Sequence, residues 1–306
     1  MLCDIQDTLK INLPKKHADK VNAYNEEWDK ENGQGWEVNN FIELTKDRKA
    51  LYDVGGNVGM FSYIFCLNNN DDQMKRSYCF EPSPEGLTNC VEILNHNDWF
   101  DRIKLFPMFI GDKNGTVSIL TEESGTFVVR FEKEDPNFTI IKKKEIGGRV
   151  STLDDFTWIA QMGNEDEEYG LDMVFEDKRE RKNKSYPGFQ KEFDLDTLKI
   201  DVEGYEQKVL IGAKETIMNF RPLMFLEIHG HLLKLYNGSV LEIYEILKNY
   251  GYKIFDIHME EIKTKEKYEN LFGAKNEIRI VCFPNEDKQL YYEKRRWPEP
   301  WKHNKV

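Results

Sequence analysis

The sequence feature that most constrains this fold is a short apolar strand. It ends in an acidic residue and leads into a glycine-rich turn. Residues 51–59 read Leu-Tyr-Asp-Val-Gly-Gly-Asn-Val-Gly, and apolar residues then recur at helical spacing. One βα unit later, a second strand at residues 78–80 is followed by Glu81. Carboxylates at the ends of two such strands, beside a glycine-rich turn, are typical of a nucleoside cofactor site at the carboxyl edge of an open α/β sheet.

The spacing of the glycines bears on which cofactor this turn could hold. A dinucleotide fingerprint reads G-x-G-x-x-G, and Gly55, Gly56 and Gly59 do not match it. The charge of Asp53 would oppose a pyrophosphate but suits a cation such as the ammonium group of S-adenosylmethionine (SAM). Glu81 lies where a carboxylate could accept hydrogen bonds from both ribose hydroxyls. The alternative is a tight βα turn that binds nothing.

The order of predicted elements indicates an α/β fold with a parallel sheet and helices on both faces. The expected strands lie near residues 50–54, 77–81, 103–109, 196–202, 222–229, 252–257 and 277–283. Helices are expected near residues 57–67, 84–95, 204–219 and 238–250.

Composition shifts divide the chain into three parts. Residues 1–48 are expected to form a helical lead-in, residues 49–285 the main domain, and residues 286–306 a C-terminal tail. Within the domain, residues 117–120 and 127–131 alternate like a β-hairpin. A charged insertion at about residues 157–194 is expected to be a solvated mobile segment, with a lid over the substrate as the alternative.

Charge and cysteine usage limit the class of protein. The 306 residues carry a formal net charge of -12, which disfavours nonspecific nucleic-acid binding. The five cysteines form no C-x-x-C pair and are odd in number, as expected for thiols in a reducing compartment. No apolar segment is long enough to span a bilayer. We therefore expect a cytoplasmic protein without nucleic-acid or membrane partners.

A second group of ionisable residues lies at the ends of two later strands. In residues 197–202, Lys199 and Asp201 share one face, and in residues 222–229 Glu227 and His229 do the same. If the two strands are neighbours, about 4.8 Å apart, the last three of these side chains converge.

Three roles remain open for this group. His229 could act as a general base, with Asp201 and Lys199 as further catalytic candidates. Asp201 and Glu227, with His229, could instead bind Mg²⁺ or Mn²⁺. The third alternative is an ion-paired cluster with only a structural role. Glu206 nearby is explained by the dipole of the helix that it begins.

Together these motifs resemble the FkbM family of SAM-dependent methyltransferases over residues 49–257. The resemblance is carried by six segments in order, namely residues 53–59, 80–84, 111–115, 151–155, 199–204 and 221–229. It implies a Rossmann-like, seven-stranded methyltransferase sheet and O-methylation of a hydroxyl, often on a sugar or a natural product. It also implies a cofactor site made of Asp53, Gly55, Asn57, Gly59, Glu81, Gly111 and Asp112.

The prediction from sequence is a SAM-dependent O-methyltransferase that acts on a glycan or another small hydroxylated acceptor. Two alternatives share the fold, a catalytically silent methyltransferase-like partner subunit and an NAD-dependent oxidoreductase. An RNA ribose methyltransferase would use the same chemistry, and the acidic charge balance argues against it.

Overall fold

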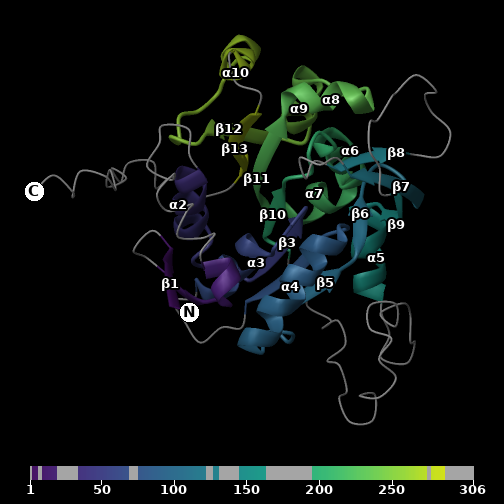
Figure 1. The fold of residues 1–306 in the computed structure, drawn as a ribbon. Helices are drawn as coiled ribbons and strands as arrows, with labels where there is room; N and C mark the ends of the chain where they lie inside the picture. Colours follow the sequence, from purple (N-terminus) through teal and green to yellow (C-terminus); the bar gives the residue numbers. More distant parts are fainter. Residues whose placement is uncertain are drawn as a thin grey trace, which may run out of the picture.

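A seven-stranded sheet organises the protein in the computed structural model (Figure 1). The structure describes residues 2–5, 9–18, 34–68, 75–121, 127–130, 145–162, 195–273 and 277–286. In spatial order the strands are β12 (Tyr252–Asp256), β13 (Glu277–Pro284), β11 (Leu223–His229), β10 (Thr197–Ile200), β3 (Ala50–Val54), β4 (Arg76–Phe80) and β5 (Ile103–Phe106). The predicted Rossmann-like sheet is therefore confirmed.

Strand direction places the ends of the central strands at one edge. Strands β11, β10, β3, β4 and β5 pair in parallel, so their carboxyl ends lie together. Strand β13 pairs antiparallel with both β11 and β12, so its first residues reach the edge where the other strands end. Residues that follow the parallel strands and residues that begin β13 can thus meet at the carboxyl edge.

Helices cover both faces of the sheet, as the alternating pattern predicts. Their bounds are α2 (Gln34–Leu44), α3 (Met60–Leu67), α4 (Pro84–Asn97), α5 (Leu153–Met162), α6 (Glu206–Gly212), α7 (Lys214–Phe220), α8 (Gly230–Leu233), α9 (Val240–Asn249) and α10 (Lys265–Phe272). One core packs α2, α3 and α4 against the sheet, and the other packs α5, α6, α7, α9 and α10 against the opposite face. Leu198 and Ile200 belong to the second core, so Lys199 between them faces α2 and α3.

The strand predicted at residues 103–109 is divided by Pro107. Strand β5 ends at Phe106, and β6 (Met108–Ile110) belongs to a second sheet of order β6-β9-β7-β8. Proline has no N–H to donate to a ladder, so the main sheet pairing stops there. In the second sheet, β7 (Gly115–Thr121) and β8 (Phe127–Arg130) pair antiparallel beside β9 (Glu145–Ser151), which confirms the predicted hairpin.

Other predictions need revision. The lead-in is not helical throughout, because β1 (Leu2–Ile5) and β2 (Leu9–Asn12) form an antiparallel pair before α2. The helix expected at residues 204–219 is interrupted at Ala213, between α6 and α7. Residues 157–162 of the expected insertion are the end of α5. The rest of the insertion, 163–194, and nearly all of the tail lie outside the described residues.

None of the helices in the described part of the chain has the length and apolar character that a transmembrane span requires.

Candidate active site

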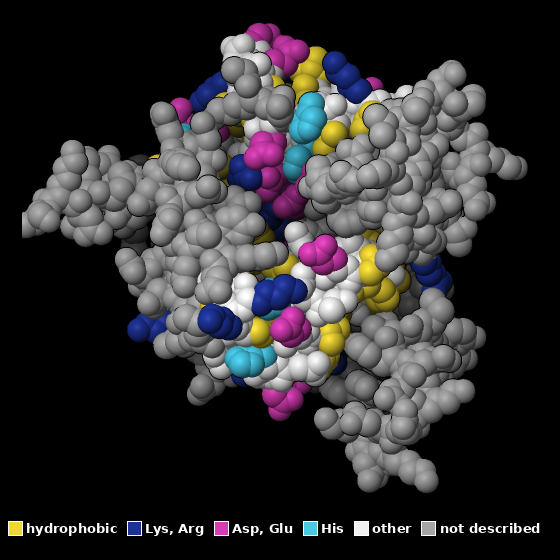
Figure 2. All heavy atoms as spheres, viewed as in Figure 1, with side chains coloured by type: hydrophobic (Ala, Val, Ile, Leu, Met, Phe, Trp, Pro, Cys, Tyr) yellow, Lys and Arg dark blue, Asp and Glu magenta, His cyan; other side chains and the backbone are white. Residues whose placement is uncertain are grey.

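The strand order brings the two groups of sequence motifs to one place. Strand β3 pairs with β4 on one side and with β10 on the other, and β10 pairs with β11. The glycine-rich turn that follows β3 therefore lies between Glu81, after β4, and Asp201, after β10. In the space-filling view, acidic and histidine side chains gather beside one another, with basic side chains between and below them (Figure 2).

The turn after β3 requires glycine because backbone from β10 packs against it. Gly55 has a φ of +81°, and a Cβ there would lie 1.8 Å from the Asp201 carbonyl oxygen. The Gly55 N–H donates to the carbonyl of Phe80 at 2.9 Å, and the Asp201 N–H donates to that of Val54 at 3.0 Å. The turn is therefore fixed between the ends of β4 and β10.

Glu81 ties this turn to the next helix. Its Oε2 accepts from the Asn57 N–H and its Oε1 from the Ser83 N–H, both at 2.7 Å. Burial raises the pKa of Glu81, against the lowering effect of these hydrogen bonds. A carboxylate has about four acceptor positions, so both oxygens keep capacity for further donors such as ribose hydroxyls.

Asp53 and Gly59 stabilise the start of α3. The Asp53 Oδ2 accepts from the Ser62 backbone N–H at 3.1 Å and from its hydroxyl at 2.6 Å, and burial raises the pKa of Asp53. Gly59, with a φ of +79°, precedes the helix, where a Cβ would lie 3.2 Å from Cys90 and Tyr63. The described contacts of Asp53 are thus those of a carboxylate at a helix N-terminus.

Gly111 and Asp112 follow β6 and pack against α6 and the loop before it. A Cβ on Gly111 would lie 2.9 Å from the Tyr205 ring, so this position admits only a very small residue. The Asp112 carboxylate lies 3.0 Å from the Lys208 ammonium. Both predicted residues therefore lie next to the loop between β10 and α6.

A buried lysine lies at the centre of the second group. The Lys199 ammonium lies 3.2 Å from Glu37 Oε1, 3.5 Å from Asp201 Oδ2 and 4.8 Å from the centre of the Phe61 ring. Burial opposes the charge, but the carboxylates of Glu37 and Asp201 raise the pKa of Lys199 above its ordinary value. Lys199 therefore supplies positive charge to the site and is a poor proton acceptor.

Asp201 and Glu227 present two carboxylates from neighbouring strands. Burial followed by the charges of Asp201 and Glu37 raises the pKa of Glu227 to about 9, and the Arg279 guanidinium contacts its Oε1. Burial also disfavours the charge on Asp201, but Lys199 and His229 hold its pKa below the ordinary value. The two carboxyl groups thus differ in charge, with Asp201 ionised at neutral pH.

The orientation of His229 is fixed by one of its ring nitrogens. Its Nδ1 lies 2.8 Å from Glu206 Oε1, while Nε2 lies 3.5 Å from Glu203 Oε2 and 3.9 Å from Glu227 Oε1. Burial disfavours the charged ring, but the contact with Glu206 and the nearby carboxylates raise the pKa of His229 to about 9. Nε2 is therefore the nitrogen that faces Asp201 and Glu227.

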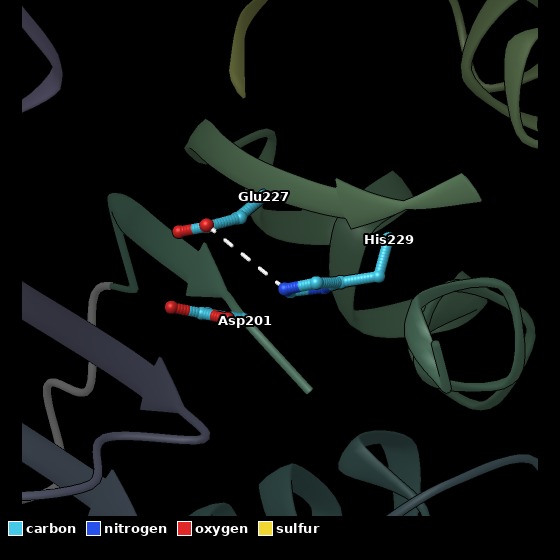
Figure 3. A group of neighbouring side chains, drawn as sticks. All are labelled: Asp201, Glu227 and His229. Atoms are coloured by element: carbon cyan, nitrogen blue, oxygen red, sulfur yellow. Dashed lines mark ion pairs between the residues drawn. The ribbon is translucent and has the colours of Figure 1, made fainter. Parts of the chain in front are cut away.

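The convergence inferred from strand alternation is present in the structure. Asp201, Glu227 and His229 each place one ligand atom within 4.8 Å of the others (Figure 3). Glu227 and His229 come from β11 and Asp201 from the end of β10. Such a set can orient a hydroxyl, exchange a proton or hold a cation.

Sequence reasoning missed two members of this group and misjudged a third. Glu37 comes from α2, where nothing in the sequence marks it, and Arg279 comes from β13. A charged residue between Ile278 and Ile280 in a largely apolar strand was the available signal for Arg279. Glu206 was attributed to the helix dipole alone, whereas it also holds His229.

Comparison with known proteins identifies the family. The family model described as "Methyltransferase FkbM domain" matches residues 53–254. A curated relative, 2-O-methyltransferase NoeI from Sinorhizobium fredii, is 24% identical over 182 residues, which are 58% of this chain and 63% of the relative. This chain thus spans just under two thirds of that relative's length.

Two solved structures show weaker similarity. A methyltransferase FkbM from Methylobacillus flagellatus aligns with a TM-score of 0.38 and 14% identity, over 78% of this chain and 44% of that one. TrmK from M. capricolum, in complex with S-adenosylhomocysteine (SAH), aligns with a TM-score of 0.38 and 8% identity, over 82% and 68%. The assignment therefore rests on the family model: this chain belongs to the FkbM methyltransferase family.

Proposed function

We propose that this protein is a SAM-dependent O-methyltransferase whose acceptor is a hydroxyl of a sugar, a glycan or another small molecule. The observation that carries the proposal is the direct link between the glycine-rich turn and Glu81, whose Oε2 lies 2.7 Å from the Asn57 nitrogen. Membership of the FkbM family supports the same reaction class.

The chemistry of the cofactor edge fits SAM. Glu81 retains acceptor capacity for the ribose hydroxyls, and it contacts the glycine-rich turn through the Asn57 N–H. Because Asp53 is held by Ser62, its part in cofactor binding would be indirect, through the position of the turn. Gly111 and Asp112 would flank the adenine, as the resemblance implies.

An acidic edge fits a cationic cofactor better than NAD. The sulfonium and ammonium groups of SAM are attracted by carboxylates, whereas a pyrophosphate beside Asp53 would be repelled. The glycine spacing also departs from the dinucleotide fingerprint. These features make the oxidoreductase the weaker alternative.

The residues near His229 would prepare the acceptor. When bound, SAM supplies a methyl group on a positively charged sulfur, and its transfer to oxygen leaves SAH and a methyl ether. In its neutral form, His229 could accept the hydroxyl proton, with Glu206 orienting the ring and Asp201 the hydroxyl. Lys199, which stays protonated, would hold Asp201 ionised and in place. In-line alignment of oxygen and methyl group would supply much of the rate increase.

The surroundings of His229 also support a hydroxylated, non-anionic acceptor. Glu203 and Glu277 are about half exposed beside its Nε2, at 3.5 and 3.9 Å. Carboxylates accept hydrogen bonds from sugar hydroxyls and repel phosphates. The name of the curated relative, a 2-O-methyltransferase, agrees with a hydroxyl acceptor.

Binding of SAH, measured by calorimetry, tests the proposal. The wild type should bind with a dissociation constant on the order of micromolar, and Glu81→Ala should weaken binding at least tenfold. Glu85→Ala removes an exposed carboxylate from the first turn of α4 and is the matched control, with unchanged affinity expected. Folded wild-type protein that bound NAD but not SAH would overturn the proposal.

Turnover separates an enzyme from a silent partner subunit. Release of SAH is measured with a panel of neutral sugars and other hydroxylated compounds. Protein that binds SAH with the expected Glu81 dependence, but releases none with any acceptor, would favour the silent subunit.

A further inference from the structure

Three ligand atoms of the kinds that divalent cations bind converge at the carboxyl edge of the sheet. Each of Asp201, Glu227 and His229 offers one atom within 4.8 Å of the others (Figure 3). Glu227 Oε1 and His229 Nε2 are 3.9 Å apart, too far for a hydrogen bond. Ligands on opposite sides of an ion with bonds of about 2.1 Å lie roughly 4.2 Å apart, so an ion fits with small movements.

His229 has the hydrogen-bonding arrangement that is usual for a histidine bound to a metal ion. A ligating imidazole usually donates its second ring N–H to a carboxylate, which fixes the ring and leaves the other nitrogen for the metal. Glu206 Oε1 takes that position at 2.8 Å from His229 Nδ1. Glu206 is fully buried, and its Oε2 has no hydrogen-bond partner among the described residues. A buried carboxylate with an unused oxygen is costly unless positive charge lies nearby.

The surrounding charges leave the group short of positive charge. Among the described residues, six carboxyl groups meet here with Lys199, Arg279 and His229 as their basic partners. The six belong to Glu37, Asp201, Glu203, Glu206, Glu227 and Glu277, and even with Glu227 protonated the acidic groups outnumber the basic ones. Lys199 and Arg279 also share Glu37, at 3.2 Å each. Neither Lys199 nor Arg279 is therefore paired with Asp201 or Glu227 alone. A bound cation would supply the positive charge that the group lacks.

We propose that Asp201, Glu227 and His229 bind one divalent cation, of which Mn²⁺ and Mg²⁺ best suit two carboxylates with an imidazole. The remaining positions would be open to water or to the acceptor hydroxyl. Beside that hydroxyl, the ion would favour loss of its proton to water, and His229 would then serve as a ligand and not as the proton acceptor. This role in methyl transfer rests on the proposed function, whereas the binding of the ion does not.

The test measures binding of Mn²⁺ to protein from which metal has been removed with a chelator. Binding is detected as a decrease in the electron paramagnetic resonance signal of the free ion. The wild type should bind one ion, and Glu227→Gln and His229→Gln should each weaken binding at least tenfold. The matched control is Glu92→Gln, because Glu92 also contacts a histidine, His17, at 3.2 Å but lies on α4. That variant should bind Mn²⁺ as the wild type does.

Two outcomes would overturn the proposal. The first is wild-type protein that shows no saturable Mn²⁺ binding and no rise in melting temperature with added Mn²⁺. The second is equal binding by the wild type and both ligand variants, which would place the ion elsewhere. Circular dichroism checks that each variant is folded, and Asp201→Asn replaces any that is not.

A titration with SAH on the same samples keeps two failures apart. Protein that binds SAH but not Mn²⁺ would remove the ion and leave the proposed function intact. Protein that binds Mn²⁺ as expected but not SAH would remove the proposed function and leave the metal site intact.

Discussion

The ammonium of Lys199 lies 3.2 Å from Oε1 of Glu37, which joins the helix before the sheet to its central strand. Both side chains are almost fully buried, and Glu37 Oε2 also lies 3.2 Å from Arg279 Nε. One carboxylate therefore bridges two cations from strands on either side of β11. The lead-in helix is thereby part of the candidate active site.

Loss of the Glu37 charge should destabilise the protein strongly. Glu37→Gln leaves two cations without their shared partner, and breaking a buried pair in this way costs about 3–5 kcal/mol. The free energy of unfolding is measured by urea titration. The control on the same helix is Glu43→Gln, which breaks an exposed pair with Lys46 and should cost less than about 1 kcal/mol. Similar small effects in both variants would contradict the central role of Glu37.

Removal of the His229 ring should affect turnover and not cofactor binding. His229→Ala is expected to lower turnover at least tenfold, whether the ring accepts a proton or holds an ion, and to leave SAH affinity within a few-fold. The readouts are SAH release with an acceptor that the wild type methylates, and SAH calorimetry. His231→Ala removes the exposed neighbouring ring, 6.5 Å away between centres, and should leave turnover unchanged. Unchanged turnover in His229→Ala would remove His229 from the mechanism.

The stability of chelator-treated protein should fall as pH rises through the range in which His229 loses its proton. The pKa of His229 is raised to about 9 in the folded protein, above the ordinary histidine value of 6.5. Its stabilising contribution is therefore fully present below pH 6.5 and is lost between that pH and about 9. A pKa difference of one corresponds to about 1.4 kcal/mol, so the loss is about 3 kcal/mol.

Comparison with a variant isolates this effect from other titrations. The carboxylates that face the ring belong to Glu203 and Glu206 before and in α6, Asp201 after β10, Glu227 on β11 and Glu277 on β13. His229→Gln keeps these groups and lacks the titrating ring. Unfolding is followed at several pH values between 6 and 9.5, and parallel pH dependence in both proteins would refute the assignment.

The sequence predicted the main sheet well because its signals are local. Strand β3 was predicted with its exact bounds, and β11 and β13 to within one residue. The break at Pro107 was missed, although proline is a visible signal, because the apolar residues on both sides continue the strand pattern. The interruption at Ala213 was missed although Gly212, the last residue of α6, is a visible signal for a helix end, because alanine and the residues after it favour helix.

The candidate site was predictable where it depends on one strand and its neighbour. Alternation placed Lys199 and Asp201 on one face and Glu227 and His229 on the same face of the next strand. Glu37 and Arg279 could not be assigned this way, because their contacts depend on how α2 and β13 pack on the sheet. Pairings between distant parts of a chain leave no periodic trace in the sequence.

The antiparallel course of β13 has a consequence for how the molecule is completed during synthesis. Because β13 enters the sheet from the carboxyl edge, Arg279 reaches Glu227 only when the last strand of the sheet has been made and inserted between β11 and β12. A nascent chain that has not yet reached β13 can already hold the turn that joins Gly55 to Glu81, because the hydrogen bonds described for this turn come from β3, β4, α3, α4 and the end of β10, which all precede β13. The two halves of the site are thus expected to form at different chain lengths, and the half proposed to meet the acceptor is completed last.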